Sequence, residues 1–434
     1  MKKLIIAIPL FFIFQIAKAQ ELLTVKQAIE IALENNYQIK LAKNEVEIAT
    51  TNVTRGNAGI LPQVSANLTQ NNNLQNTKQT LSSGDVRDMK NAQNNSLVYG
   101  VSMGWTIFDG LAMFRRYDIL KENQKREQVE LQRVIITQVS DIITTYYTIV
   151  EQLNVLDAID SSILISQDRF TTAEHRLSIG KTSRLEVLNA QVNLNADESE
   201  RIRQVNTIKN LKVLLNSLMN RDLMIEFEVD RTVVYDENIT YESLLESARL
   251  HNPDLQMISI NKNLAELELK RIKANRYPTL RLNLGYNFSQ SESSIGFATN
   301  SNSRGLNYGM TIGVNIFDGF NQRRNEQIAK LQIKNSDIMM QQQDLTIRTA
   351  IASAFQTYQT HLQLVKMEEK NQEIAKLNLD ITLEKFKIGT ISAAEFRDAQ
   401  ENYINAIARY NAAKLQAKLS ELQMKEIVGQ INLD

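Results

Sequence analysis

A short motif that occurs twice constrains this chain more than any other feature. Residues 98–110 read VYGVSMGWTIFDG and residues 307–319 read NYGMTIGVNIFDG, so seven of the 13 aligned positions are identical. The segments 176–191 (RLSIGKTSRLEVLNAQ) and 385–400 (KFKIGTISAAEFRDAQ) match at the same offset of 209 residues. Self-similarity over such a length indicates that the chain consists of two structural repeats.

The first repeat follows a targeting segment. Two lysines precede a mostly apolar run from Leu4 to Ile16 and the small-residue pattern Ala17-Lys18-Ala19, which is typical of a secretory signal peptide. An N-terminal membrane anchor is the alternative, but the run is shorter than the ~20 residues that span a membrane. We therefore expect an exported protein, with a signal peptide at 1–19 cleaved after Ala19, a first repeat at 20–236 and a second repeat at 237–434.

The composition excludes several kinds of chemistry. The chain has 434 residues, no cysteine, 3 scattered histidines and a formal net charge of zero. It therefore has no disulfide, no thiolate metal site and no cysteine nucleophile, and its charge gives no indication of nucleic acid as a partner. A phosphate-binding glycine loop, an HExxH motif and a nucleophile elbow are also lacking. We predict no enzymatic activity, no cofactor and no metal site.

Alternation of apolar residues with Gly, Ser, Thr and Asn predicts four strands, arranged as hairpins at 62–108 and 278–317. Proline at the start of each hairpin marks the change from helix to strand. We interpret the polar stretches 70–96 and 289–305 as connecting loops. The apolar positions that we expect to face lipid are Tyr99, Val101, Met103, Trp105, Tyr308, Met310, Ile312 and Val314.

A soluble antiparallel sheet would show the same alternation, but three features favour a membrane barrel. The strands have about the ~9–11 residues of membrane-spanning strands, aromatic residues lie near their ends, and the polar alternates suit a wet lumen. Four strands cannot close a barrel, and an open edge would leave backbone groups unpaired in hydrocarbon. Two copies would supply eight strands and three copies twelve. Cyclic symmetry with a usable pore favours three.

The rest of the chain is predicted to be helical. Residues 111–178 contain neither Pro nor Gly, and their apolar residues recur at steps of four and three, as in a coiled coil. Gly180 and Gly389 each end a long helix, and a serine three residues later begins the next one, which predicts helical hairpins with tips near 180 and 389. A soluble helical bundle is the alternative, although helices this long are unusual in a compact domain.

The duplicated layout, the opening LTVKQAIEIALENN, the two IFDG strand ends and the two helix tips together resemble the TolC-like outer-membrane efflux proteins over essentially the whole mature chain. The resemblance implies a mainly α fold with a membrane β-barrel portion, in which a homotrimer forms a 12-stranded barrel in the outer membrane and a periplasmic α-helical tunnel. It implies the exit duct of a tripartite efflux or type I secretion system. The partners would be outer-membrane lipid, a periplasmic adaptor and, through it, an inner-membrane pump of RND, ABC or MFS type. The competing hypothesis is a structural or adhesive coiled-coil protein of the cell envelope.

The resemblance also implies two sites at the helix tips. Glu395 and Asp398, three residues apart and so on one helix face, match positions at which some relatives place an acidic ring in the periplasmic gate. Glu186 is the counterpart of Glu395 in the first repeat, and a solvated helix face is the alternative interpretation. Some relatives latch the closed gate with a basic residue where this chain has Ile391. Adaptor contacts should involve Gly180, Lys181, Thr182, Gly389, Thr390 and Ser392.

Overall fold

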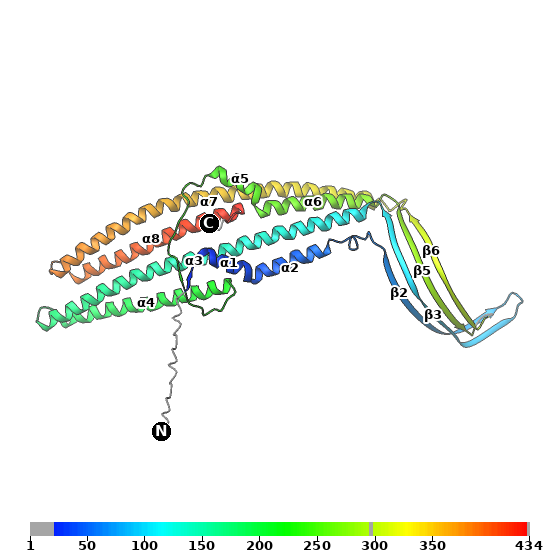
Figure 1. Cartoon of the computed structure of the whole chain (residues 1–434), viewed down its shortest axis with the longest axis horizontal. Coiled ribbons are helices and arrows are strands. Elements are labelled where there is room, and N and C mark those ends of the chain that lie inside the picture. Colours follow the sequence, from blue (N-terminus) through cyan, green and yellow to red (C-terminus); the bar gives the residue numbers. More distant parts are fainter. Residues whose placement is uncertain (1–20, 295–297, 432–434) are drawn as a thin grey trace, which may run out of the picture. The chain divides into compact units, whose positions relative to one another are not determined.

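The computed structural model describes residues 21–294 and 298–431, so the predicted signal peptide lies outside the described residues. The same order of elements occurs twice, namely two short helices, two strands and two long helices (Figure 1). The first set is α1 (Val25–Asn35), α2 (Tyr37–Asn52), β2 (Gln63–Thr80), β3 (Val86–Asp109), α3 (Ala112–Ser178) and α4 (Arg184–Leu218). The second set is α5 (Tyr241–His251), α6 (Pro253–Ala274), β5 (Thr279–Ser293), β6 (Asn300–Gly313), α7 (Asn321–Lys387) and α8 (Ala393–Val428).

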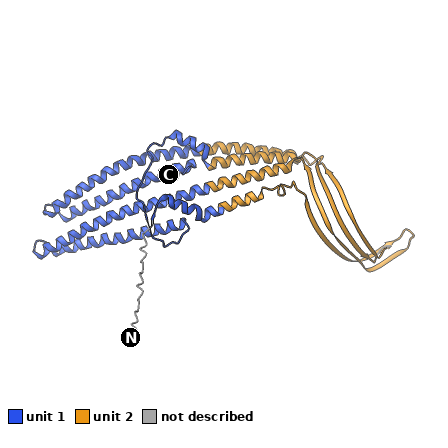
Figure 2. Ribbon diagram, viewed as in Figure 1, with its two compact units in different colours: residues 1–41, 133–252, 347–434 blue, residues 42–132, 253–346 orange. Residues whose placement is uncertain are grey.

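The chain divides into two compact units, each with segments from both predicted repeats (Figure 2). The sheet unit consists of residues 42–132 and 253–346. The helical unit consists, within the described residues, of 21–41, 133–252 and 347–431, and it holds both helix tips. The two compact units therefore do not coincide with the two predicted repeats. The boundaries of the repeats stay a prediction. Among the residues that the structure describes, no helix is both long and apolar enough to cross a membrane.

Four antiparallel strands of the sheet unit lie in the order β2-β3-β5-β6. Their register brings apolar residues into rows across the sheet. Met103 on β3, for example, is paired with Val64 on β2 and with Leu284 on β5. On the same face the rings of Tyr99 and Phe288 stack with their centroids 5.0 Å apart. The four predicted strands are therefore confirmed, and their apolar residues share one face.

The polar stretches that we predicted as connecting loops are mostly strand. Residues 81–85 alone separate β2 from β3, and β5 ends at Ser293 with β6 beginning at Asn300, where the sequence predicts loops over 70–96 and 289–305. That prediction was wrong because these stretches lack apolar alternation. The strand ladder is nevertheless made by backbone N–H and C=O groups, which pair whatever side chains the strands carry.

One predicted strand position also falls outside the sheet. Gly313, the last residue of β6, is paired with Thr279, the first residue of β5. Val314 therefore lies one residue beyond the last pair of the ladder. Its sequence counterpart in the first repeat, Trp105, lies within β3 and is paired with Leu282.

The repeated Asp-Gly that ends the opening motif is a strand-to-helix corner in both repeats. The carboxylate of Asp109 accepts the backbone N–H of Met113 at 3.0 Å, and that of Asp318 accepts the backbone N–H of Gln322 at 2.7 Å. The glycine after each aspartate has a φ of 68° or 67°, a conformation that costs glycine little because it lacks a Cβ atom. The aspartate thus caps the long helix that follows.

The core of the helical unit surrounds Tyr146 on α3. Its hydroxyl donates to the carbonyl of Leu23 at 2.8 Å and accepts the backbone N–H of Asp230 at 2.9 Å. These partners adjoin β1 (Glu21–Leu23) and β4 (Phe227–Val229), a parallel pair that the sequence analysis did not predict. Three-residue strands are too short to show alternation. Burial raises the pKa of Tyr146 to about 12, so the hydroxyl stays a neutral donor.

Two asparagines at equivalent places make the same contact. The side-chain amide of Asn36 donates to the carbonyl of Leu218 at the end of α4, at 2.9 Å, and that of Asn252 donates to the carbonyl of Ile427 near the end of α8, at 2.6 Å. Both asparagines are buried. Each ties the junction of two short helices to the last turn of a long helix, so the internal duplication extends to side-chain contacts.

Candidate functional site

Both helix tips have the same backbone geometry. The tip glycines, Gly180 and Gly389, have φ values of 74° and 78°. The residue after each glycine donates its N–H to a carbonyl five residues earlier, at 2.8 Å from Lys181 and at 3.0 Å from Thr390. This is a Schellman-type helix end, which a glycine makes without strain. Of the six predicted adaptor contacts, Thr182 is half-buried, and the exposed ones are Gly180, Lys181, Gly389, Thr390 and Ser392.

The three predicted gate carboxylates differ in their contacts. Glu395 accepts the backbone N–H of Ser392 at 2.9 Å, while the hydroxyl of Ser392 accepts the backbone N–H of Glu395 at 3.2 Å, which is a capping box. Glu186 lies 3.5 Å from the buried guanidinium of Arg169. Asp398 is exposed on the first turns of α8. The Ser-x-x-Glu spacing at 392–395 signals this capping role, which the sequence analysis overlooked.

A buried polar network joins the two helical hairpins of one chain. Arg397 on α8 forms a bidentate ion pair with Asp197 on α4, at 3.1 and 3.0 Å. Asp197 also accepts a hydrogen bond from Ser166 on α3 at 2.6 Å, and Gln400 on α8 donates to Ser162 on α3 at 2.7 Å. Burial alone would lower the pKa of the Arg397 guanidinium, but hydrogen bonds to carboxylates raise it above its usual value, so the arginine stays charged.

Closer to the tips, an arginine of the first hairpin contacts an aromatic pair of the second. The ring of Phe386 on α7 stacks on that of Phe396 on α8 with centroids 5.2 Å apart. The guanidinium of Arg176 on α3 lies 5.6 Å from the centroid of Phe386 and donates to the carbonyl of Lys387 at 3.0 Å. Ile391 packs against the same cluster. The position at which some relatives carry a basic latch residue is therefore part of an apolar contact here.

The four-stranded sheet has one apolar and one polar face. On the apolar face the predicted lipid-facing residues are exposed or half-buried, namely Tyr99, Val101, Met103, Trp105, Tyr308, Met310 and Ile312. The polar face carries rows such as Gln63, Gly104, Asn283 and Gly309, and it borders a hollow of about 500 Å³. Such a sheet can bury one face in lipid while the other stays in water.

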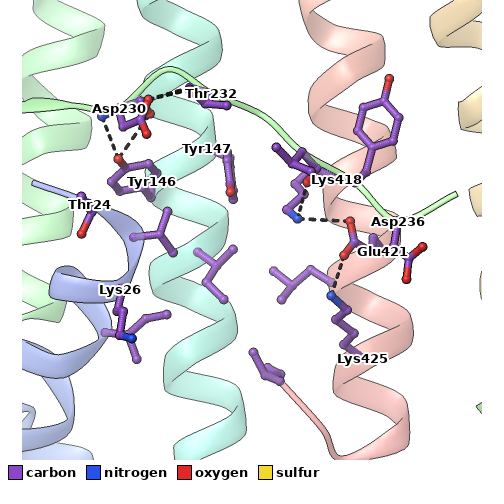
Figure 3. Close-up of a pocket in the computed structure, with 17 residues that line it drawn as sticks. Thr24, Lys26, Tyr146, Tyr147, Asp230, Thr232, Asp236, Lys418, Glu421 and Lys425 are labelled. Carbon is purple, nitrogen blue, oxygen red and sulfur yellow. Dashed lines mark hydrogen bonds and ion pairs between the residues drawn. The ribbon is translucent and has the colours of Figure 1, made fainter. Parts of the chain in front are cut away.

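A cavity of about 880 Å³ lies in the helical unit between α1, α3, α8 and the segment after β4 (Figure 3). On its wall the buried Glu421 lies between Lys418, at 3.1 Å, and Lys425, at 2.6 Å. Burial, together with the charge of Glu421, raises the pKa of Tyr147. Glu421 thus forms ion pairs with both lysines. Within residues 21–294 and 298–431, no group of three or more His, Cys, Asp or Glu residues could hold a metal ion.

One protein family matches the chain in two segments. The model of the outer membrane efflux protein family matches residues 28–221 and 244–430. Protein CyaE of Bordetella pertussis is 20% identical over 412 residues, which cover 94% of this chain and 84% of that protein. Outer membrane protein TolC of Escherichia coli is 18% identical over 447 residues, which cover 100% of this chain and 87% of that protein.

Solved structures share the fold. The CmeC outer membrane channel of Campylobacter jejuni superimposes with a TM-score of 0.76 at 17% sequence identity, over 93% of this chain and 85% of that one. The MtrE outer membrane channel of Neisseria gonorrhoeae superimposes with a TM-score of 0.72 at 14% identity, over 94% and 89%. The family match covers most of both repeats, and the family and fold are those of outer-membrane channel proteins. The chain therefore belongs to the outer membrane efflux protein family.

Proposed function

We propose that three copies of this chain close a twelve-stranded barrel in the outer membrane, which continues into a periplasmic tunnel of long helices. The trimer is the exit duct of a tripartite efflux or type I secretion system and conducts its substrates passively, without chemistry of its own. The chain is exported with cleavage after Ala19. The observation that carries the proposal is a four-stranded sheet with one apolar face, one polar face and two unpaired edges, in a chain of the efflux family.

The unpaired edges of the sheet require several copies of the chain to assemble. Among the residues that the structure describes, β2 pairs with β3 alone and β6 pairs with β5 alone, so each edge carries unpaired backbone N–H and C=O groups. In hydrocarbon each such group costs several kcal/mol. Successive strands alternate in direction, so β6 of one copy can pair antiparallel with β2 of the next. Repeating this step around a threefold axis closes the barrel and removes every edge.

Two relatives with the same fold, from Campylobacter jejuni and Neisseria gonorrhoeae, are described as outer membrane channels. This description supports conduction as the activity. The exposed tips are the surfaces that we assign to a periplasmic adaptor, which links the duct to an inner-membrane pump of RND, ABC or MFS type. Their shared capping geometry would hold both tips in one shape for docking.

Thr182→Cys and Thr390→Cys should crosslink to the adaptor in intact cells. The natural sequence has no cysteine, so each variant carries one reactive thiol, and neither residue is a helix N-cap as Ser183 and Ser392 are. A short thiol crosslinker followed by mass spectrometry identifies what is captured. Thr346→Cys, exposed on α7 far from the tip, should capture no adaptor. If both tip variants crosslink only to neighbouring copies of the chain, the docking assignment is wrong.

Glu395→Gln combined with Asp398→Asn should weaken the cation selectivity of reconstituted pores. In a trimer these positions would supply six carboxylates around the tunnel entrance, and such a cluster attracts cations. Glutamine also serves in a capping box, so the start of α8 should be retained and the change isolates charge. The reversal potential across a planar bilayer in a salt gradient measures the effect. Unchanged selectivity and conductance would remove these residues from the gate.

A further inference from the structure

The polar face of the sheet carries almost no charge. From the row Gln63, Gly104, Asn283 and Gly309, alternate residues along each strand lie on this face. Along β5 from Thr279 to Ser293, and on the residues of the other strands in register with it, these residues are Gly, Ser, Thr, Asn or Gln with three exceptions, which are Val98, Asp109 and Arg281. The rows of Asp109 and Arg281 lie beyond the start of β2, and a bulge between Thr106 and Phe108 brings Asp109 to this face. Asp109 and Arg281 are therefore the two charged side chains on this part of the face.

Of the two charges, that of Asp109 is neutralised within the chain. Asp109 is the last residue of β3, and its carboxylate lies 2.9 Å from the guanidinium of Arg116 while also capping α3. Its side chain is 12% exposed. At the same end of the sheet, the buried carboxylate of Glu326 is paired with Arg276, and Asp318 accepts the backbone N–H at the start of α7.

Arg281, by contrast, is exposed, and within the described residues its guanidinium has no ion pair. Its neighbours across the ladder are Thr106 on β3 and Thr311 on β6. It lies two residues from the start of β5, at the end of the sheet that adjoins the helices. A free guanidinium in this place is open to a ligand from solution.

The next row of the sheet leaves room beside Arg281. Asn283 is flanked by Gly104 and Gly309, and a Cβ atom built on either glycine would meet nothing within 4 Å. Packing within the chain therefore does not require glycine at these two positions. Gly100 differs, because a Cβ there would lie 2.3 Å from the side chain of Asn287. The open row beside Arg281 is part of the wall of the 500 Å³ hollow.

We infer that Arg281 sets the ion preference of the barrel by attracting anionic solutes, namely carboxylates and phosphates, to its helix-side end. The inference rests on the proposed function, because only closure of three copies makes the polar face a lumen and places three Arg281 side chains at one level. A guanidinium binds carboxylate and phosphate oxygens with paired N–H groups. Three like charges that have no ion-pair partners raise the local concentration of anions.

The test uses Arg281→Cys, whose thiol is the only one in the chain. Pores reconstituted in a planar bilayer are measured in a KCl gradient near 0.1 M. Loss of the arginine should shift the anion-to-cation permeability ratio towards cations by about tenfold. Three charges in water at ~8 Å, with a screening length of ~10 Å, raise the local anion concentration about threefold and lower that of cations about threefold. A positively charged methanethiosulfonate reagent should restore the ratio and a negatively charged one should shift it further. Near 1 M KCl the screening length falls to ~3 Å, so the differences in permeability ratio between these forms should vanish.

Arg304→Cys is the matched control. Arg304 is an exposed arginine of the same sheet, but it is paired with Phe288 and so lies on the apolar face. Arg304→Cys should have the same anion-to-cation permeability ratio as the natural protein, both before and after reaction with the methanethiosulfonate reagents. The inference would be overturned if Arg281→Cys had the same anion-to-cation permeability ratio when unmodified and after either reagent. An equal shift of this ratio in Arg304→Cys would overturn it as well. If neither Arg281→Cys nor Arg281→Lys formed pores, the inference would also be overturned, because the Arg281 side chain would then be needed for packing. If the natural protein itself formed no pores, the proposed function would fail instead.

Discussion

Ile312→Asp should prevent the protein from assembling in the outer membrane, whereas Thr311→Asp should not. Ile312 is 64% exposed within one chain and pairs with Leu280 on the apolar face of the sheet. A charge on the lipid face of a barrel costs ~2–4 kcal/mol per site near the midplane and ~0–1 kcal/mol near the interfaces, somewhat less for a carboxylate, and Ile312 lies one residue from the end of β6. Three copies would each bear that cost. We expect the proposed trimer to be absent from washed outer membranes.

Thr311 supplies the matched control, because it precedes Ile312 on the same strand and lies on the opposite face. It is paired with Arg281, so the new carboxylate would lie beside an unpaired guanidinium and in water. Assembly of Thr311→Asp should equal that of the natural protein, as judged by the amount of trimer on native gels. Equal assembly of the two variants would mean that the faces of the sheet are assigned the wrong way or that the sheet is not in lipid.

Arg397→Met should destabilise the tip half of the helical unit by about 3–5 kcal/mol, because it leaves the buried Asp197 without its partner. The side chain of Asp197 is 9% exposed and that of Arg397 is 20% exposed. An uncompensated carboxylate at that depth must either stay charged without a counter-ion or take up a proton. The urea midpoint of the helical circular dichroism signal in detergent measures the loss.

Arg201→Met is the control for this prediction, because Arg201 pairs with Asp160 where both side chains are nearly half exposed, at 48% and 44%. An exposed ion pair contributes only ~0–1 kcal/mol, so this change should move the midpoint little. The double variant Arg397→Met with Asp197→Leu should recover much of the loss, since it removes the buried charge itself. Similar losses for Arg397→Met and Arg201→Met would show that the buried network does not stabilise the hairpins.

Local patterns allowed most of the fold to be predicted. The tip glycines and the serines three residues later predicted the hairpins, because both residue types act through backbone geometry within a few positions. The strands followed from alternation around Tyr99 and Met310. The same rule failed for residues 70–96, where polar side chains on both faces hide a strand, and for the three-residue pair Glu21–Leu23 and Phe227–Val229.

Long-range contacts could not be predicted in this way. Arg397 and Asp197 are 200 residues apart, and nothing local to either residue shows that α8 and α4 meet there. The role of Glu395 is different, since the Ser-x-x-Glu spacing does signal a capping box. Its carboxylate was assigned to a gate from the resemblance alone. A carboxylate engaged in a cap can still carry charge at a tunnel entrance, and the selectivity measurement decides whether it does.

The most direct test of the trimeric duct is the mass of the protein extracted from urea-washed outer membranes. The structure leaves two unpaired sheet edges in each chain, and three copies are the number that we expect to close them. Native mass spectrometry in detergent should therefore give three times the mass of one mature chain, with no protein in the soluble periplasmic fraction. A wholly soluble periplasmic protein, or a membrane form of one or two copies, would contradict the account.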